Sequence, residues 1–119
     1  MSNTIEIPVD IQHNTVICGR NGGNARGCRE DRIVWSSRSP HAEFTLRFFP
    51  LGLENAGATE LEKLFPWPFE EPRPHDGIVS PRIKFVGTLR HVEEPLAFKY
   101  TIAVGNWVLD PIIIVDKKT

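Results

Sequence analysis

The segment Phe98-Lys-Tyr-Thr-Ile-Ala-Val-Gly-Asn-Trp-Val-Leu-Asp-Pro-Ile-Ile-Ile-Val115 decides the fold of this chain. Apolar and polar residues alternate at its start, which is the period of a half-buried β-strand. Asp110-Pro111 is typical of a turn, because the Asp side chain can bond its own downstream backbone and proline presets φ. The segment therefore predicts two strands, 98–104 and 112–115, joined by a short loop.

Similar short segments precede it along most of the chain. The expected strands are residues 5–11, 15–18, 32–36, 43–49 and 82–89. Pro8 lies in the first of them and cannot donate to a ladder, so we expect an edge position or a bulge there. Strands at this spacing favour an antiparallel β-sandwich over alternating strands and helices. We therefore expect a single all-β domain covering residues 1–119.

An irregular insert, residues 50–77, interrupts the strands. Thr59-Glu-Leu-Glu62 fits a capping box, so the insert should contain one short helix near residues 59–65. Four prolines within residues 66–74 make the next piece extended and rigid. Trp67 in this piece either stacks on a ligand or folds back with Phe69 to plug one end of the sandwich.

The inward positions of the expected strands predict the hydrophobic core. Ile33 and Trp35 should share one face of their strand, so Val34 and Trp35 cannot both point inward. The expected core residues are Ile7, Val34, Trp35, Phe44, Leu46, Phe48, Ile83, Phe85, Tyr100, Ile102, Val104, Ile113 and Val115.

Composition limits the function classes. A formal net charge of -1 argues against nucleic-acid binding, which requires a surplus of basic residues on one face. The N-terminus has neither a basic region nor an apolar region of a signal peptide, and no apolar run approaches the roughly 20 residues of a membrane helix. We therefore expect a cytoplasmic protein without a membrane segment, in which Cys18 and Cys28 are free thiols.

The segment 19–31 is rich in glycine, asparagine and arginine and has no apolar period, so it predicts a loop. Its backbone could form an anion-binding nest, and Arg20, Arg26 and Arg29 could pair with a phosphate or carboxylate. The alternative is a flexible hairpin loop with solvated arginines. Two interpretations of Trp107 are equally favoured by the sequence: it either caps the core or stands exposed as a contact residue.

Four of these segments together resemble the cupredoxin-like family. They are Val34-Trp-Ser36, Phe44-Thr-Leu-Arg-Phe48, Phe98-Lys-Tyr-Thr-Ile102 and Asp110-Pro-Ile-Ile-Ile-Val115. The chain is most similar to small bacterial members of unassigned function, and the resemblance covers roughly residues 3–116. It implies a cupredoxin-like Greek-key β-sandwich. Copper-binding members supply a histidine before the Phe-rich strand, and cysteine, histidine and usually methionine between the last two strands.

The corresponding loop, residues 102–111, contains no cysteine, histidine or methionine, and the only methionine is Met1. Ser39-Pro-His41 alone matches the upstream ligand position. We therefore expect a metal-free binding or interaction module without a cofactor, and no nucleophile–base arrangement predicts an enzyme. The alternative is a metal-binding or redox protein that uses His41 with Cys18 or Cys28.

The expected contact surface lies on the loops 19–31, 36–41 and 105–110, since binding residues usually sit on exposed loops of a rigid scaffold. The expected partner is an unknown protein or a small anionic ligand. A homodimer is also possible, because an open sandwich leaves edge strands uncovered.

Overall fold

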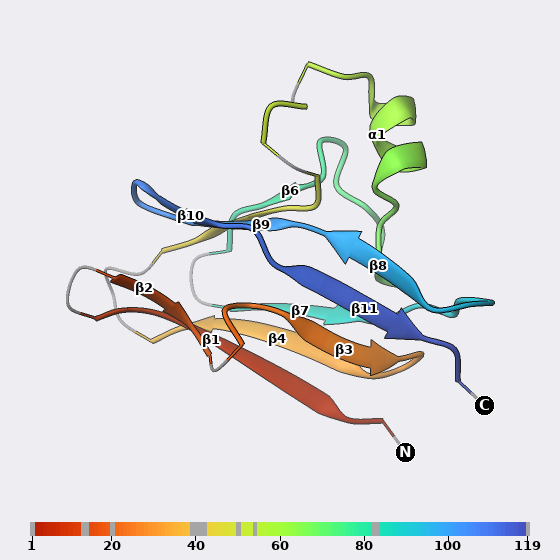
Figure 1. Cartoon of the computed structure of the whole chain (residues 1–119), viewed down its shortest axis with the longest axis horizontal. Coiled ribbons are helices and arrows are strands. Elements are labelled where there is room, and N and C mark those ends of the chain that lie inside the picture. Colours follow the sequence, from red (N-terminus) through yellow and green to blue (C-terminus); the bar gives the residue numbers. More distant parts are fainter. Residues whose placement is uncertain are drawn as a thin grey trace.

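The computed structural model describes residues 2–12, 15–19, 21–38, 43–49, 51–53, 55–81 and 84–118. These residues form eleven strands and one helix (Figure 1). The elements are β1 (Thr4–Gln12), β2 (Thr15–Cys18), β3 (Ala25–Cys28), β4 (Arg32–Ser37), β5 (Thr45–Arg47), α1 (Ala58–Leu64), β6 (Ile78–Val79), β7 (Lys84–Thr88), β8 (Leu96–Lys99), β9 (Thr101–Val104), β10 (Trp107–Leu109) and β11 (Ile112–Asp116).

The strands form three hydrogen-bonded sheets, in the orders β2-β1-β4-β7, β10-β9-β5-β6 and β3-β11-β8. Two pairs, β1 with β4 and β3 with β11, run parallel, whereas the other named pairs are antiparallel. In Figure 1 the β1, β4 and β7 strands form one layer, and β8 and β9 lie above it. The prediction of a mostly β fold with one short helix is confirmed, but two of the three sheets are mixed rather than purely antiparallel.

Most of the expected core is buried between these sheets. The confirmed members are Ile7, Trp35, Phe44, Leu46, Phe48, Tyr100, Ile102, Val104, Ile113 and Val115. The expectation that Val34 belongs to the core is wrong, because Ile33 and Trp35 are fully buried and the residue between them points away from the core. Phe85 is half-buried against the core, and Ile83 lies outside the described residues.

The segment 98–104 is not one strand, as expected, but two. β8 pairs with β11, whereas β9 pairs with β5 and β10, and the chain changes partners at Tyr100. Phe98, Tyr100 and Ile102 are all buried, so the alternation continues across the break and gives no sign of it. The expected loop after this segment is also shorter, because Trp107–Leu109 returns as β10.

Three further expectations about local structure are corrected. Residues 19–31 are not all loop: β3 lies within them and pairs in register with β11, although Arg26 and Gly27 break any apolar period. The expected helix is present as α1, but its N-cap is Gly57, without a side-chain cap. Thr59 is already inside the helix, so the capping box is wrong. The expected edge position of Pro8 is wrong for the strand as a whole, because β1 lies between β2 and β4; Pro8 pairs with Ser36 of β4 and lies one residue before the pairing with β2 begins.

The proline-rich segment plugs the core, as one of its two readings predicted. Trp67 and Phe69 are buried, and the Phe69 ring meets the Trp35 ring edge-on, with centroids 5.8 Å apart. The Trp67 Nε1 donates a hydrogen bond of 2.7 Å to the Glu71 carbonyl. Phe69 also occupies the space over Gly87, where a Cβ would lie 2.5 Å from the ring. The plug therefore requires a glycine at that position of β7.

A chain of buried polar groups crosses the core. The Trp35 Nε1 donates to the Tyr100 hydroxyl over 3.2 Å, and the Tyr100 hydroxyl donates to the Gly23 carbonyl. Burial raises the pKa of Tyr100, so the hydroxyl stays protonated and available as a donor. Each of these groups would lose a partner if the hydroxyl were removed.

Tyr100→Phe should therefore lower the free energy of unfolding by about 1–3 kcal/mol, because it leaves the Trp35 N–H and the Gly23 carbonyl buried without a partner. Urea unfolding, followed by tryptophan fluorescence, measures the change. Thr4→Val, which removes one exposed hydroxyl, is the control and should alter stability by less than about 0.5 kcal/mol. Equal stability of Tyr100→Phe and the wild type would contradict this role.

Asp31 holds several segments together at the other end of the molecule. Its buried carboxylate accepts hydrogen bonds from the backbone N–H groups of Asn3 (2.8 Å) and Cys28 (3.0 Å). Its backbone carbonyl accepts from the Leu89 N–H. Burial raises the pKa of the Asp31 carboxyl, but the hydrogen bonds from Asn3 and Cys28 outweigh it, and the pKa lies below its usual value.

Because the folded-state pKa of Asp31 is lowered, its ionised form stabilises the protein above the unfolded pKa of about 4, and this contribution disappears as the pH falls through the folded value. Unfolding free energy should therefore decrease as the pH drops below about 4, and Asp31→Asn should flatten that dependence. Denaturant unfolding at pH values about one unit apart, from about pH 3 to about pH 7, measures how steeply the unfolding free energy depends on pH. Asp116→Asn, in a more exposed ion pair, should change the slope less; the reverse ranking would contradict the role of Asp31.

Candidate functional site

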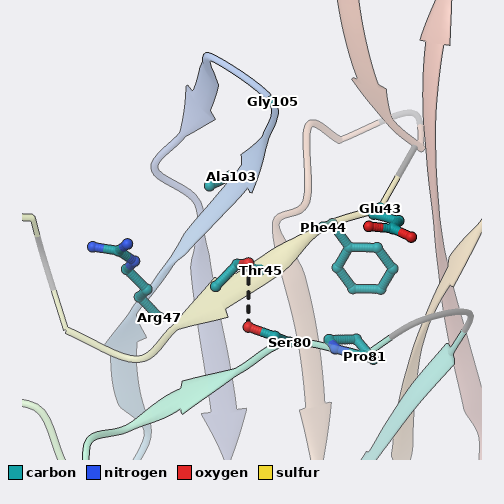
Figure 2. A pocket seen from close by; sticks show the side chains of 8 residues that line it. All are labelled: Glu43, Phe44, Thr45, Arg47, Ser80, Pro81, Ala103 and Gly105. Carbon is teal, nitrogen blue, oxygen red and sulfur yellow. Dashed lines mark hydrogen bonds between the residues drawn. The ribbon is translucent and has the colours of Figure 1, made fainter. Parts of the chain in front are cut away.

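A pocket of about 650 Å³ lies on the outer face of the β10-β9-β5-β6 sheet (Figure 2). β5 points Leu46 into the core, together with Phe44 and Phe48 on either side, so Thr45 and Arg47 project to the opposite face. The pocket is lined by residues of three neighbouring segments: Glu43, Phe44, Thr45 and Arg47 at β5, Ser80 and Pro81 after β6, and Ala103 and Gly105 at the β9–β10 hairpin.

Two hydroxyl groups lie in the middle of this pocket. The Thr45 Oγ1 and the Ser80 Oγ are 3.3 Å apart and share a hydrogen bond, which Figure 2 shows as a dashed line. Ser80 reaches Thr45 because β5 and β6 are paired next to it. Opposite Thr45 on β9 is Ala103, whose methyl group leaves the space above the sheet open. Each hydroxyl can both donate and accept, so the pair can adjust to either polarity of ligand group.

The charged groups of the pocket flank this hydroxyl pair. Figure 2 shows Arg47 on one side of Thr45 and Ser80, and Glu43 on the other. Glu43 is exposed, and Arg47 is half-buried. The pocket therefore changes from positive to negative along its length, with neutral hydrogen-bonding groups between the two ends.

The structure describes two of the three arginines expected to bind an anion, and each of the two lies near a carboxylate. Arg26 lies on β3 and makes a two-bond ion pair with Asp116 on β11, with N–O distances of 2.7 and 2.8 Å. This hydrogen-bonded arginine lowers the pKa of the Asp116 carboxyl. Arg29 lies 3.9 Å from the carboxylate of its neighbour Glu30. Arg20 lies outside the described residues.

The two tryptophans named as candidate contacts have opposite surroundings. Trp67 is 8% exposed and packs against Phe48 and Phe69, so its ring faces are covered. Trp107 is 51% exposed on the β9–β10 hairpin, which matches the reading of it as an exposed residue. Of the three loops expected to form the contact surface, 105–110 contributes Gly105 to the pocket. The loop 19–31 contains β3, which pairs with β11. Residues 39–41 lie outside the described chain.

The alternative metal site needs His41 together with the thiol of Cys18 or of Cys28, and His41 lies outside the described residues. Both cysteines are free, as expected. Cys18 is buried, and its burial raises the pKa of the thiol to about 11. Burial, together with the nearby Asp31 carboxylate, also raises the pKa of Cys28, whose thiol lies 3.6 Å from Asp31 Oδ2. Within the ranges that the structure describes, no group of three or more histidine, cysteine, aspartate or glutamate side chains is placed to hold a metal ion.

Comparison with family models, with curated proteins and with solved structures finds no match to this chain. The one helix of the described residues, α1, is too short to cross a membrane.

Apart from Gly105, which belongs to the expected contact loop 105–110, the residues of the pocket were not among the candidates named from the sequence. The alternation of β5 does place Thr45 and Arg47 on the outward face, which is the one available signal. Nothing in the sequence connects them with Ser80 or Ala103, because that proximity arises only from the pairing of β5 with β6 and β9.

Proposed function

We propose that this chain is a metal-free, cupredoxin-like binding module, and that the pocket between Arg47 and Glu43 holds a small polar ligand. The observation that carries the proposal is the Thr45–Ser80 hydroxyl pair in the centre of a 650 Å³ pocket, between groups of opposite charge. A volume of this size is that of many small-molecule sites.

The arrangement favours a ligand that carries both charges. A carboxylate at the Arg47 end would be attracted by the guanidinium, whereas a second anionic group at the far end would be repelled by Glu43. The hydroxyl pair would hydrogen-bond the polar part in between. Amino acids and short peptides have this distribution of charge, whereas nucleotides and other polyanions do not.

One feature supports the cupredoxin-like part of the proposal, and another supports its metal-free part. The fold is mostly β, with the core enclosed between paired sheets. The segment 102–111, where copper-binding members carry most of their ligands, contains no cysteine, histidine or methionine and instead contributes Ala103 and Gly105 to the pocket. A site that binds polar molecules at this hairpin therefore suits the residues that the chain has.

The hydroxyl pair can be tested by removing each hydroxyl while its approximate volume is kept. Thermal-shift measurements with single amino acids, dipeptides, dicarboxylates and nucleotides should give stabilisation by the zwitterionic compounds. Thr45→Val and Ser80→Ala should each weaken the best ligand about two- to tenfold in Kd, measured by titration calorimetry, because each loses a hydrogen bond worth roughly 0.5–1.5 kcal/mol.

Thr4→Val, an exposed threonine of β1, is the matched control and should leave the Kd unchanged. The proposal fails if none of these compounds binds, or if polyanions bind better than zwitterions. It also fails if both pocket variants bind as tightly as the wild type. Titration with Cu(II), watched for an intense thiolate–copper absorption band, separately tests the metal alternative.

A further inference from the structure

The edge of the β10-β9-β5-β6 sheet at β10 is open within the described residues. β9 and β10 are joined by the two-residue turn Gly105-Asn106, and the positive φ of Gly105 (58°) fits a type II′ hairpin. In such a hairpin the flanking residues, Val104 and Trp107, form the hydrogen-bonded pair. Because hydrogen-bonded and non-bonded pairs alternate, the N–H and C=O groups of Val108 point away from β9, toward the open edge.

This edge is apolar and exposed. Trp107 and Val108 are 51% and 46% exposed, and Leu109 is half-buried. Natural edge strands are usually protected by a charge, a proline or a bulge within the strand, and β10 has none of these. All three tryptophans of the chain are described, and Trp35 and Trp67 are buried, so Trp107 is the exposed one.

The β10 edge is complementary to itself. If two copies pair antiparallel about a two-fold axis at Val108, each Val108 meets the other, and Trp107 meets Leu109 of the second copy. The same register places the exposed amide of Asn106 opposite the carboxylate of Asp110. Each cross-strand pair is therefore chemically matched: apolar with apolar, and a neutral donor with an anion.

The negative charge of Asp110, at the end of β10, does not oppose the pairing. Lys99 lies 2.9 Å from the Asp110 carboxylate and partly neutralises it in each copy. In the proposed register Asp110 meets Asn106 and not the other Asp110, so like charges are kept apart. A parallel arrangement, or a shift of the register by two residues, would lose the Trp107–Leu109 match.

We propose that the partner of this edge is a second copy of the same chain, bound through antiparallel β10–β10 pairing centred on Val108. The axis is perpendicular to the sheet at a hydrogen-bonded Val108 pair, so the joined sheet presents both pockets on one face. The dimer does not depend on the ligand proposed for those pockets. Because β10 is short, the association is weak and depends on concentration.

Sedimentation velocity over a wide range of protein concentrations tests the association. The wild type should shift from monomer toward dimer as the concentration rises, and acrylamide quenching of its fluorescence should fall over the same range as Trp107 becomes covered. Val108→Lys places two like charges directly opposite each other and should abolish the shift. Ile17→Lys, on the exposed face of the edge strand β2, is the matched control and should dimerise like the wild type.

A cysteine pair tests the register. In a Cys28→Ser background, Val108→Cys should form a disulfide-linked dimer on mild oxidation, because the Cα atoms of a hydrogen-bonded antiparallel pair lie about 5.5 Å apart, within disulfide range. Asn106→Cys, which faces Asp110 in this register, should crosslink poorly. A wild type that stays monomeric at the highest concentration overturns the proposal. So does a dimer that survives Val108→Lys, or equal crosslinking at both positions.

Discussion

The hydroxyl of Tyr100 connects three parts of the molecule by hydrogen bonds. It accepts from Trp35 on β4, in the β2-β1-β4-β7 sheet, and donates to Gly23 in the turn between β2 and β3. Tyr100 itself lies where β8 ends and β9 begins, so it belongs to the boundary between the other two sheets. The Tyr100 ring stacks on Phe48, with centroids 5.3 Å apart, and meets Trp35 edge-on. Polar and apolar contacts of one residue therefore fix how the sheets meet.

The change of partner at Tyr100 also determines what the surface can do. Because β9 leaves β11 and pairs with β5 and β10, it brings the hairpin beside the outward side chains of β5. The pocket exists because of this pairing, and so does the open edge of β10. Both the proposed ligand site and the proposed dimer edge thus depend on the change of strand partner at Tyr100, although the alternation of apolar residues continues through that position.

The parts of the structure that could be predicted are those in which one face of a strand is buried. Phe44, Leu46 and Phe48 were expected to point inward and do so, because a period of two directly reports that burial. β3 was missed because Arg26 and Gly27 give it no such period, and its place is fixed by parallel pairing with a strand far along the chain. The pocket was missed for the same physical reason: Ser80 and Ala103 reach Thr45 only through tertiary pairing. The exposure of Trp107 remained open because an apolar residue in a turn can face either way.

The two ends of the described chain are held by two residues that are adjacent in the sequence, Glu30 and Asp31. Asn3 donates to the carboxylate of Asp31, and Lys118 lies 3.2 Å from the carboxylate of Glu30. Figure 1 shows both ends on the same side of the molecule, away from the β9–β10 hairpin. A short linker could therefore join them in a circular permutant with little strain. Fusion partners or surface attachment at either end would likewise leave the hairpin and the pocket facing outward, so the protein can be displayed by its ends without covering the part proposed to bind.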